Sequence, residues 1–188
     1  MISIGYLERA MRNFSNIVLI GPMGAGKTSI GRALAKEIGW EFYDSDQVIE
    51  EGSGVDLLWI YDVEGCEGFA RREQKVICEL MQKTNIVLAT GGGTVANCTN
   101  CELIIEKGFV IYLTTSLVDQ LVRTGYSKKR PLSNESSKRL EALKYWQAEC
   151  SPVYEKLADV TYNTDSKTLK AAVADLVLLV SEKHSLLV

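Results

Sequence analysis

A glycine-rich stretch near the start of the chain restricts its possible folds more than any other feature. Residues 21–28 read Gly-Pro-Met-Gly-Ala-Gly-Lys-Thr, which is a glycine, four further residues and then Gly-Lys-Thr. This is the phosphate-binding loop pattern, in which backbone N–H groups at a helix N-terminus surround phosphate oxygens. In such a loop Lys27 can reach the β- and γ-phosphates, and the hydroxyl of Thr28 can coordinate Mg²⁺.

The residues on both sides of the loop provide the setting that it requires. Residues 17–20 are apolar and mostly β-branched, which predicts a strand buried on both faces. Downstream, apolar residues recur at helical spacing at Ile30, Ala33, Leu34 and Ile38. Gly39 follows at the position where a helix is expected to end. A strand, a glycine loop and a helix in this order predict binding of a nucleoside triphosphate.

Length and composition favour one soluble globular domain. The chain has 188 residues, of which 46% are hydrophobic and 24% are charged, and these values are ordinary for such a domain. The net charge of −3 gives no electrostatic reason to expect nucleic-acid binding, and no apolar run reaches the roughly 20 residues needed to cross a bilayer. Residues 1–15 lack the apolar core of a signal peptide and are expected to form an N-terminal extension. These features predict a cytoplasmic protein.

The five cysteines do not predict a disulfide framework, because their number is odd and they are scattered along the chain. Cys98 and Cys101 form a Cys-x-x-Cys pair, a spacing that occurs in metal and redox sites. A zinc site needs further ligands, and the only histidine, His184, lies close to the C-terminus. We therefore expect reduced cysteines without a role in metal binding or redox chemistry.

Strands and helices are expected to alternate along the rest of the chain. The further strand candidates are residues 41–43, 86–89, 109–113 and, more weakly, 160–162. The helical patterns include two short ones between 47 and 68, broken at 51–54, a longer one at about 68–83 and a final one at 168–182. This alternation predicts an α/β fold with a mainly parallel sheet, in which ligands bind at the carboxyl ends of the strands. The phosphate-binding loop, the Asp-Ser-Asp at 44–46 and three glycines at 91–93 all fall at such ends.

Residues 123–137 depart from this pattern because they are polar and basic, with Lys-Lys-Arg at 128–130 followed by Pro131. A run of this kind can be a solvated loop. Beside a phosphate-binding loop, we favour a lid that closes over ATP and supplies a cation to the transferring phosphoryl group.

Several motifs follow the phosphate-binding loop in a fixed order. They are Tyr-Asp-Ser-Asp at 43–46, Glu-Gly at 64–65 with Gly-Phe at 68–69, Leu-Ala-Thr-Gly-Gly-Gly at 88–93, Lys-Arg-Pro-Leu at 129–132 and Pro-Val-Tyr at 152–154. From residue 16 onward the chain thereby resembles the shikimate kinase family, which belongs to the P-loop kinases similar to nucleoside-monophosphate kinases. The resemblance implies one kinase domain over 1–188, with a five-stranded parallel sheet sandwiched by helices, a substrate-binding region at 44–83 and a lid at 123–137.

The resemblance also implies a reaction, in which the γ-phosphoryl group of ATP moves to a hydroxyl of shikimate in aromatic amino-acid biosynthesis, with Mg²⁺ as cofactor. Asp46 would hold the substrate hydroxyls and help to deprotonate the attacking one, beside the backbone of Gly91, Gly92 and Gly93. Mg²⁺ would be held by Thr28 and, through water, by Asp44. Either aspartate could also be a helix N-cap, a role compatible with catalysis by the other.

The remaining implied roles concern the nucleotide and its transferring phosphoryl group. The implied ATP-binding residues are Gly21, Gly24, Ala25, Gly26, Lys27, Thr28, Ser29, Arg123, Arg130 and Lys167. Among them Arg123 and Lys167 would lie near the adenine, and Arg130 would be the lid arginine. Catalysis would rest on Lys27, Asp46 and Arg130.

The chain departs from the family pattern at the substrate end. The family has two arginines that bind the shikimate carboxylate, and here the matching substrate-binding positions are Ala70 and Cys150. Cys66 stands where the family usually has an acidic residue. Loss of one partner of a desolvated arginine–carboxylate pair costs about 2–5 kcal/mol, so we expect weak shikimate binding. Arg71 could reach back from the neighbouring position but would lose the preorganised geometry, while Arg72 and Arg139 are placed less well.

Three functions are therefore open. The first, which we favour, is an ATP-dependent shikimate kinase with weak affinity for shikimate. The second is a kinase for another, uncharged hydroxylated metabolite, and the third is a catalytically idle nucleotide-binding regulatory protein. The retention of Lys27, Asp46 and Arg130 argues against an idle protein. Size and resemblance predict a monomer whose partners are ATP and a small hydroxylated metabolite, and neither nucleic acid nor a membrane.

Overall fold

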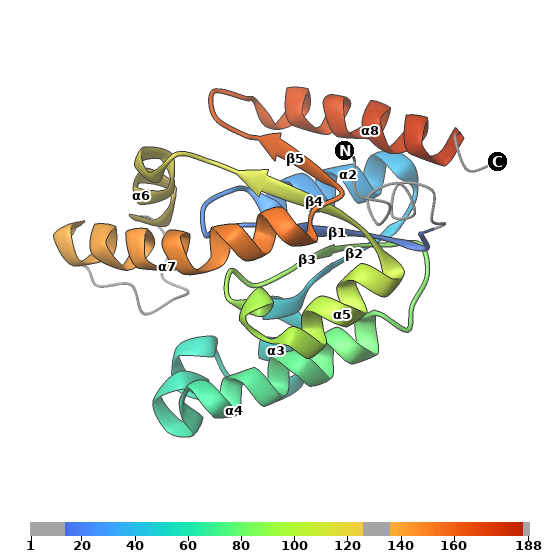
Figure 1. Ribbon diagram of the computed structural model, residues 1–188. Helices are drawn as coiled ribbons and strands as arrows, with labels where there is room; N and C mark the ends of the chain where they lie inside the picture. Colours follow the sequence, from blue (N-terminus) through green and yellow to red (C-terminus); the bar gives the residue numbers. More distant parts are fainter. Residues whose placement is uncertain (1–13, 126–135, 186–188) are drawn as a thin grey trace.

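The computed structural model describes residues 14–125 and 136–185, which form a parallel β-sheet with helices on both of its faces (Figure 1). In chain order, the elements are β1 (Asn16–Ile20), α2 (Lys27–Ile38), β2 (Glu41–Asp44), α3 (Ser45–Ser53), α4 (Leu57–Leu80), β3 (Ile86–Ala89), the 3₁₀ helix η1 (Thr94–Ala96), α5 (Cys98–Lys107), β4 (Gly108–Thr114), α6 (Leu117–Gly125), α7 (Ser136–Leu157), β5 (Val160–Asn163) and α8 (Leu169–Ser185). The expected α/β fold with a five-stranded parallel sheet is confirmed.

The strand that leads into the phosphate-binding loop lies at the centre of the sheet. The strand order is β2-β3-β1-β4-β5, and all five residues of β1 are buried, as its apolar sequence predicts. Asn16 pairs with Ile86 of β3 on one side and with Gly108 of β4 on the other. The Asn16 side chain also accepts a hydrogen bond from the N–H of Ile86 at 3.2 Å and donates one to the carbonyl of Lys83 at 2.8 Å. The base of the loop is thus held by two neighbouring strands.

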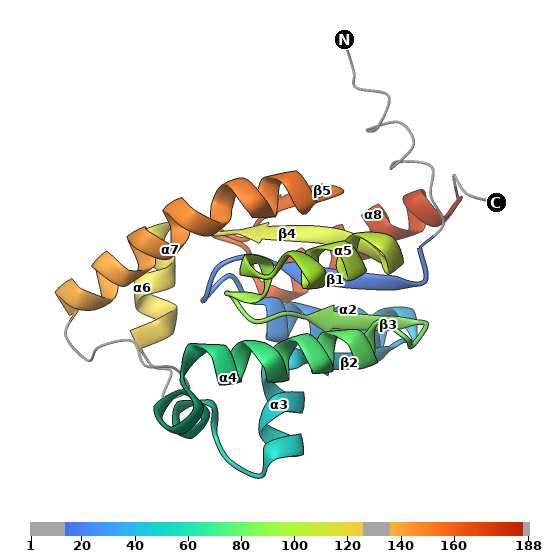
Figure 2. The same cartoon turned by 60° about the horizontal axis from the view of Figure 1, so that its bottom comes forward.

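The two faces of the sheet form separate hydrophobic cores, because side chains alternate along each strand. Ile17 and Leu19 of β1 pack with residues of α2 and α8, whereas Val18 and Ile20 pack with residues of α4, α5 and α7. Figures 1 and 2 show these helices on opposite sides of the sheet. Both layers are therefore anchored on β1, and the loop that follows it is fixed relative to both.

A third, smaller apolar cluster joins α3 to the first half of α4 beside the sheet, where Figure 2 shows both helices projecting from the main body. Two helices were expected here, a short one and a longer one from about residue 68, and α4 spans both, from Leu57 to Leu80, with a kink between them at Gly65. Gly65 alone is non-helical, with φ 69° and ψ −175°, angles that strain any residue except glycine. The bend at Gly65 explains why the sequence pattern is typical of two helices.

The other expected boundaries agree closely with the structure. The break at 51–54 is confirmed, since α3 ends at Ser53 and Gly54 follows with a left-handed backbone. The strand predicted at 86–89 is β3, and α2 ends before Gly39 as expected. Most of the expected lid, residues 126–135, lies outside the described residues. Within the described ranges, no helix combines the length and the apolar character needed to span a membrane.

Candidate active site

The phosphate-binding loop connects β1 to α2 through glycines with backbone angles that other residues rarely adopt. Gly24 and Gly26 have φ of 80° and 91°, and α2 begins directly after Gly26. The first N–H groups of a helix have no partner within it, so this junction offers donors to an anion. The ammonium of Lys27 donates to the carbonyls of Gly21 at 2.7 Å and Pro22 at 2.8 Å, and the side chain is buried. Lys27 is therefore held against its own loop.

Asp44 connects the loop helix to the helix after β2. Its Oδ2 accepts a hydrogen bond from the hydroxyl of Thr28 at 2.6 Å. Its Oδ1 caps α3 by accepting from the N–H groups of Asp46 at 3.0 Å and Gln47 at 3.4 Å. The structure thus brings together the two predicted metal ligands, Thr28 and Asp44. Hydroxyl and carboxylate oxygens are the hard donors that Mg²⁺ prefers, so this pair fits the ion.

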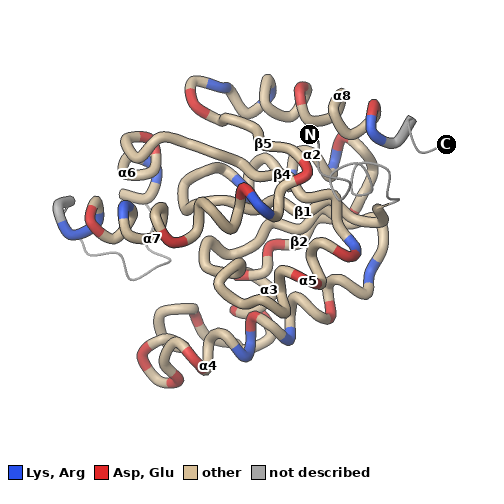
Figure 3. The backbone as a smooth tube through the Cα atoms, viewed as in Figure 1, with Lys and Arg blue, Asp and Glu red and all other residues tan. Residues whose placement is uncertain are grey.

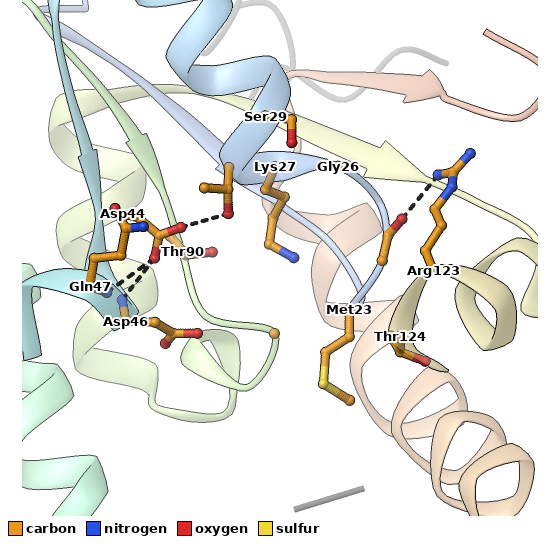
Figure 4. A pocket seen from close by; sticks show the side chains of 13 residues that line it. Met23, Gly26, Lys27, Ser29, Asp44, Asp46, Gln47, Thr90, Arg123 and Thr124 are labelled. Atoms are coloured by element: carbon orange, nitrogen blue, oxygen red, sulfur yellow. Dashed lines mark hydrogen bonds between the residues drawn. The ribbon is translucent and has the colours of Figure 1, made fainter. Parts of the chain in front are cut away.

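A cavity of about 530 Å³, which we call the loop cavity, opens beside these groups (Figure 4). Its described lining is Met23, Gly24, Gly26, Lys27, Thr28, Ser29, Asp44, Asp46, Gln47, Thr90, Gly92, Arg123 and Thr124. Most of the predicted ATP-binding residues are in this set, and Asp46 shares the cavity with Lys27, whereas Gly21 and Ala25 belong to the loop but not to the lining. The loop cavity therefore combines phosphate-binding donors, two carboxylates and two cations.

Three of the predicted ATP-binding residues, Arg123, Arg130 and Lys167, lie outside the loop sequence and differ in their positions. Arg123 of α6 lines the loop cavity and donates to the carbonyl of Gly24 at 3.0 Å, while it also pairs with Asp119 at 2.8 Å. Lys167 is not in the described lining; it forms an ion pair with Asp175 at 3.1 Å. Arg130 lies outside the described residues. Of the two that are described, the structure thus brings Arg123 to the loop and not Lys167.

The glycine segment at 91–93 separates the loop cavity from a second cavity. The N–H of Gly91 donates to the hydroxyl of Ser45 at 3.0 Å, and the phenol of Tyr154 donates to the carbonyl of Gly92. Gly92 lines both cavities, and Gly93 lines only the second one. The segment after β3 is thus held by hydrogen bonds to α3 and α7 at the boundary between the two cavities.

The second cavity, which we call the helix cavity, has a volume of about 280 Å³ and lies between α4 and α7. Its described lining is Pro22, Met23, Tyr61, Cys66, Phe69, Glu73, Gly92, Gly93, Gln120, Ala142, Leu143, Trp146, Gln147 and Tyr154. The rings of Tyr61 and Phe69 stack with centroids 4.4 Å apart. Glu73 is 4% exposed, and its Oε1 accepts a hydrogen bond from the hydroxyl of Thr94 at 2.6 Å. The cavity is mainly apolar, with one buried carboxylate.

Ala70 and Cys150 lie beside the helix cavity but are absent from its described lining. Ala70 follows the lining residue Phe69 in α4, and Cys150 lies four residues before Tyr154 in α7. Cys150 is buried in the core cluster on that face of the sheet, and this burial raises the pKa of its thiol. The described wall of the helix cavity is therefore formed by neighbours of Ala70 and Cys150 and not by these two side chains.

Two of the arginines that could replace the missing ones, Arg71 and Arg72, contact glutamates of α4. Arg72 forms two hydrogen bonds to Glu64, at 2.9 and 2.6 Å, and a third to the hydroxyl of Ser53 at 3.0 Å. Contact with this guanidinium lowers the pKa of Glu64. The side chain of Arg71 is 72% exposed and lies 4.0 Å from Glu67. Neither arginine is in the described lining of the helix cavity, so the structure does not bring Arg71 or Arg72 to that wall.

Sequence reasoning missed several lining residues. In the loop cavity they are Met23, Gln47, Thr90 and Thr124, and in the helix cavity they include Glu73, Gln120, Leu143, Trp146 and Gln147. Cys66, Phe69 and Glu73 are spaced by three and four residues, so they share one helix face. That spacing was a usable signal for Glu73. No sequence pattern indicated the lining residues of α7, because only the fold places α7 opposite α4.

The Cys-x-x-Cys pair lies at the start of α5. Cys98 is the first residue of that helix and is exposed, whereas the thiol of Cys101 donates to the carbonyl of Val95 at 3.3 Å. Partial burial, together with the neighbouring Cys98, raises the pKa of Cys101. In the part of the chain that the structure describes, no group of three or more His, Cys, Asp or Glu side chains could hold a metal ion.

Comparison with known proteins links this geometry to one group of enzymes. A family model described as shikimate kinase matches residues 23–180. A shikimate kinase of Legionella pneumophila (strain Corby) is 57% identical over 164 residues, covering 86% of this chain and 92% of the relative. The corresponding values for shikimate kinase 1 of Yersinia enterocolitica are 50% over 155 residues, 82% and 90%. Among solved structures, shikimate kinase from Acinetobacter baumannii in complex with shikimate superposes with a TM-score of 0.85 at 37% identity, covering 93% of this chain and 97% of that one.

Proposed function

The chain belongs to the shikimate kinase family and is a small-molecule kinase of that type, and we propose that it transfers the γ-phosphoryl group of ATP to a hydroxyl of shikimate with weak affinity for shikimate. One observation carries the proposal. Lys27, the Thr28–Asp44 pair and Asp46 line one cavity, and this loop cavity shares Met23 and Gly92 with the helix cavity next to it. A phosphoryl donor in the loop cavity and a phosphoryl acceptor in the helix cavity would meet at the glycine segment, residues 91–93.

In this proposal the nucleotide phosphates bind to the N–H groups of the loop and the start of α2. Lys27 exchanges its bonds to the loop carbonyls for phosphate oxygens and stabilises the charge that develops during transfer. Thr28 and, through water, Asp44 would hold Mg²⁺, which would neutralise phosphate charge. Arg123, at the edge of the cavity, contacts the nucleotide, and Arg130 is a further cation for the phosphates.

The acceptor occupies the helix cavity and extends its reacting hydroxyl past Gly92 towards the loop. Asp46 lines the loop cavity, so it can accept the hydroxyl proton as the new bond to phosphorus forms. Little covalent chemistry is demanded of the protein, because phosphoryl transfer depends chiefly on positioning and charge stabilisation.

Adding shikimate should therefore stimulate ADP release. Asp46→Asn should lower kcat at least 100-fold with a smaller effect on the KM for ATP. Millimolar shikimate without stimulation would contradict a shikimate kinase.

Weak shikimate affinity follows from the residues at positions 70 and 150. We expect the double variant Ala70→Arg/Cys150→Arg to bind shikimate at least tenfold more tightly, because each arginine adds a fork for the carboxylate. Calorimetric titration of the parent and the double variant with shikimate, in the presence of ADP, measures the two affinities. Since Cys150 is buried, an arginine there has to displace neighbouring core side chains. Ala70 is itself half-buried, so Ala70→Arg alone is a second variant, and melting temperatures control for folding. Equal affinity of the folded variants and the parent would contradict the proposal.

A further inference from the structure

We propose that Gln120 of α6 is a specificity-determining residue, whose amide binds a hydroxyl of the phosphoryl acceptor in the helix cavity. This inference rests on the proposed function, because it names a residue that recognises the acceptor at the same kinase site. Gln120 lies outside the motifs that carry the family resemblance. Three features support the inference: the burial of the amide, its remaining hydrogen-bond capacity and the attachment of α6 to the phosphate-binding loop.

The side chain of Gln120 is a polar group in a mainly apolar wall. Gln120 is 1% exposed, and it lines the helix cavity together with Leu143 and Trp146 of α7. An amide hidden from solvent is costly unless its polar atoms are paired. A ligand that offers hydrogen bonds to this amide is therefore favoured over a ligand that offers only carbon.

One hydrogen bond fixes the amide and leaves most of its capacity for a ligand. Its Nε2 donates to the carbonyl of Thr115 at 3.2 Å, and within residues 14–125 and 136–185 this is the only hydrogen bond of the Gln120 side chain. A primary amide has two N–H donors and a carbonyl oxygen with two lone pairs. Donation to Thr115 therefore leaves the carbonyl oxygen and a second N–H. Together they match a hydroxyl, a group that both donates and accepts.

The contacts of α6 hold Gln120 in a fixed position relative to the phosphate-binding loop. Gly24 of the loop approaches so closely that a Cβ there would lie 3.2 Å from the Cα of Gln120. Arg123 donates to the carbonyl of Gly24 at 3.0 Å, and the hydroxyl of Thr124 donates to the carbonyl of Gln120 at 2.7 Å. Arg123 and Thr124 line the loop cavity (Figure 4). About one turn of α6 thus contributes Gln120 to the helix cavity and two residues to the loop cavity.

The charged side chains of α6 have other partners. Asp119 and Arg123 are the charged residues of this helix (Figure 3), and they pair with each other at 2.8 Å. Neither of them is in the described lining of the helix cavity. Recognition by α6 in that cavity therefore depends on a neutral amide. Such an amide binds a hydroxyl whether or not the acceptor carries a charge elsewhere on its ring.

The test combines one substitution with the removal of one hydroxyl. Gln120→Met keeps the length of the side chain and removes the amide. The acceptors are shikimate and its two deoxy analogues, each of which lacks one hydroxyl that is not phosphorylated. In the parent, one analogue should show at least tenfold lower kcat/KM for ADP release than shikimate, because the amide is then left without its partner. In Gln120→Met, the same analogue should fall below shikimate by less than threefold.

Gln74→Met is the matched control, because Gln74 is a half-buried glutamine of α4 outside the described lining of the helix cavity. It should discriminate between the acceptors as the parent does, and melting temperatures establish that each variant is folded. A merely structural role of Gln120 would instead lower kcat/KM by the same factor for all three acceptors. The parent alone gives a test that is independent of folding: if neither analogue loses more than threefold, Gln120 binds no hydroxyl.

The outcomes separate this inference from the proposed function. If shikimate is phosphorylated and Gln120→Met discriminates as strongly as the parent, the kinase stands and the role of Gln120 is overturned. If shikimate binds in calorimetry with ADP but stimulates no ADP release, the proposed transfer fails. The same comparison, measured as affinities, then still decides the role of Gln120. If shikimate does not bind at all, both proposals fail.

Discussion

Asp44 illustrates how one side chain can support both local structure and chemistry. One of its oxygens caps α3, and the other accepts a hydrogen bond from Thr28 in the loop helix. A cap needs only an acceptor oxygen, whereas binding of Mg²⁺ benefits from the negative charge. The two contributions can therefore be separated by substitutions that remove one property at a time.

We expect Asp44→Asn to keep the cap of α3 and to impair Mg²⁺ binding. We expect Asp44→Ala to lose the cap and also to impair Mg²⁺ binding. The asparagine variant should need at least tenfold more Mg²⁺ for half-maximal ADP release, with a nearly unchanged melting temperature. The alanine variant should in addition lose about 1 kcal/mol of unfolding free energy because α3 loses its cap. Magnesium titrations and urea denaturation measure the two effects. If both variants required the same Mg²⁺ as the parent, Asp44 would have no part in metal binding.

Asp165 gives a prediction about acid stability. Its Oδ1 accepts from the N–H of Ser116 at 2.9 Å and from the hydroxyl of Thr115 at 2.8 Å, and these bonds hold its pKa below the usual value. A carboxyl with a lowered pKa in the folded state stabilises the fold fully above its unfolded pKa of about 4. That stabilisation decreases as the pH falls further, through the folded-state pKa.

The stability difference between the parent and Asp165→Asn should therefore be largest near neutral pH and shrink below about pH 4. Thermal unfolding between pH 3 and pH 7 measures it. Asp62→Asn, which changes an exposed carboxylate on α4, serves as the matched control. A difference that stays constant over the whole range would show that the hydrogen bonds to Asp165 do not depend on its charge.

At the scale of elements, the bend in α4 positions one wall of the helix cavity. Gly65 combines φ 69° with ψ −175°, yet a Cβ placed there would meet no atom within 4 Å. A substitution at Gly65 therefore tests backbone strain without a steric clash. The ion pair between Glu64 and Arg72 spans the bend, at 2.6 Å, and joins the two halves of the helix.

We expect Gly65→Ala to cost about 1–3 kcal/mol, because alanine is strained in this conformation. It should also raise the KM for the acceptor at least threefold while leaving the KM for ATP nearly unchanged, since Tyr61 precedes the bend and the phosphate-binding loop does not depend on it. Gly52→Ala is the matched control: it also has open space around its Cβ, but it lies inside α3 at a negative φ. It should be neutral or stabilise the fold by up to about 1 kcal/mol. Equal effects of the two substitutions would contradict the strain argument.

At the scale of the whole molecule, nucleotide binding should stabilise the complete domain, because the loop is anchored in the central strand. At 100 times its dissociation constant, a ligand of the native state adds about 2.7 kcal/mol. For a domain of this size, that raises the melting temperature by roughly 5–10 °C. Scanning calorimetry with and without ATP and Mg²⁺ should show this shift, and Lys27→Met should lose most of it. A variant that kept the full shift would exclude Lys27 from phosphate binding.

Local patterns predicted much of this fold, because strands buried on both faces and a glycine loop leave clear signals. The strand at 86–89 and the ends of α2 and α3 follow directly from apolar runs and glycines. The pattern indicated two helices at 57–80, and the kink between them lies at Gly65, three residues before the expected start at about 68, because no sequence signal fixes which residue takes the non-helical conformation. The helix cavity could not be predicted as a whole, since α7 meets α4 there only through tertiary packing. For the same reason, no pattern could place Cys150 within the core instead of on the wall.

The central position of β1 also has a consequence for synthesis on the ribosome. Asn16 of β1 pairs with residues 86 and 108, so its partners emerge about 70 and 90 residues later. At about 5–20 residues per second, the strand waits several seconds for its second neighbour. Until residue 86 is made, this apolar strand has no partner on either edge, and until residue 108 is made it lacks one of its two partners; unpaired strand edges are prone to aggregation. A strand that is fully buried in the folded protein is thus unprotected for seconds during synthesis.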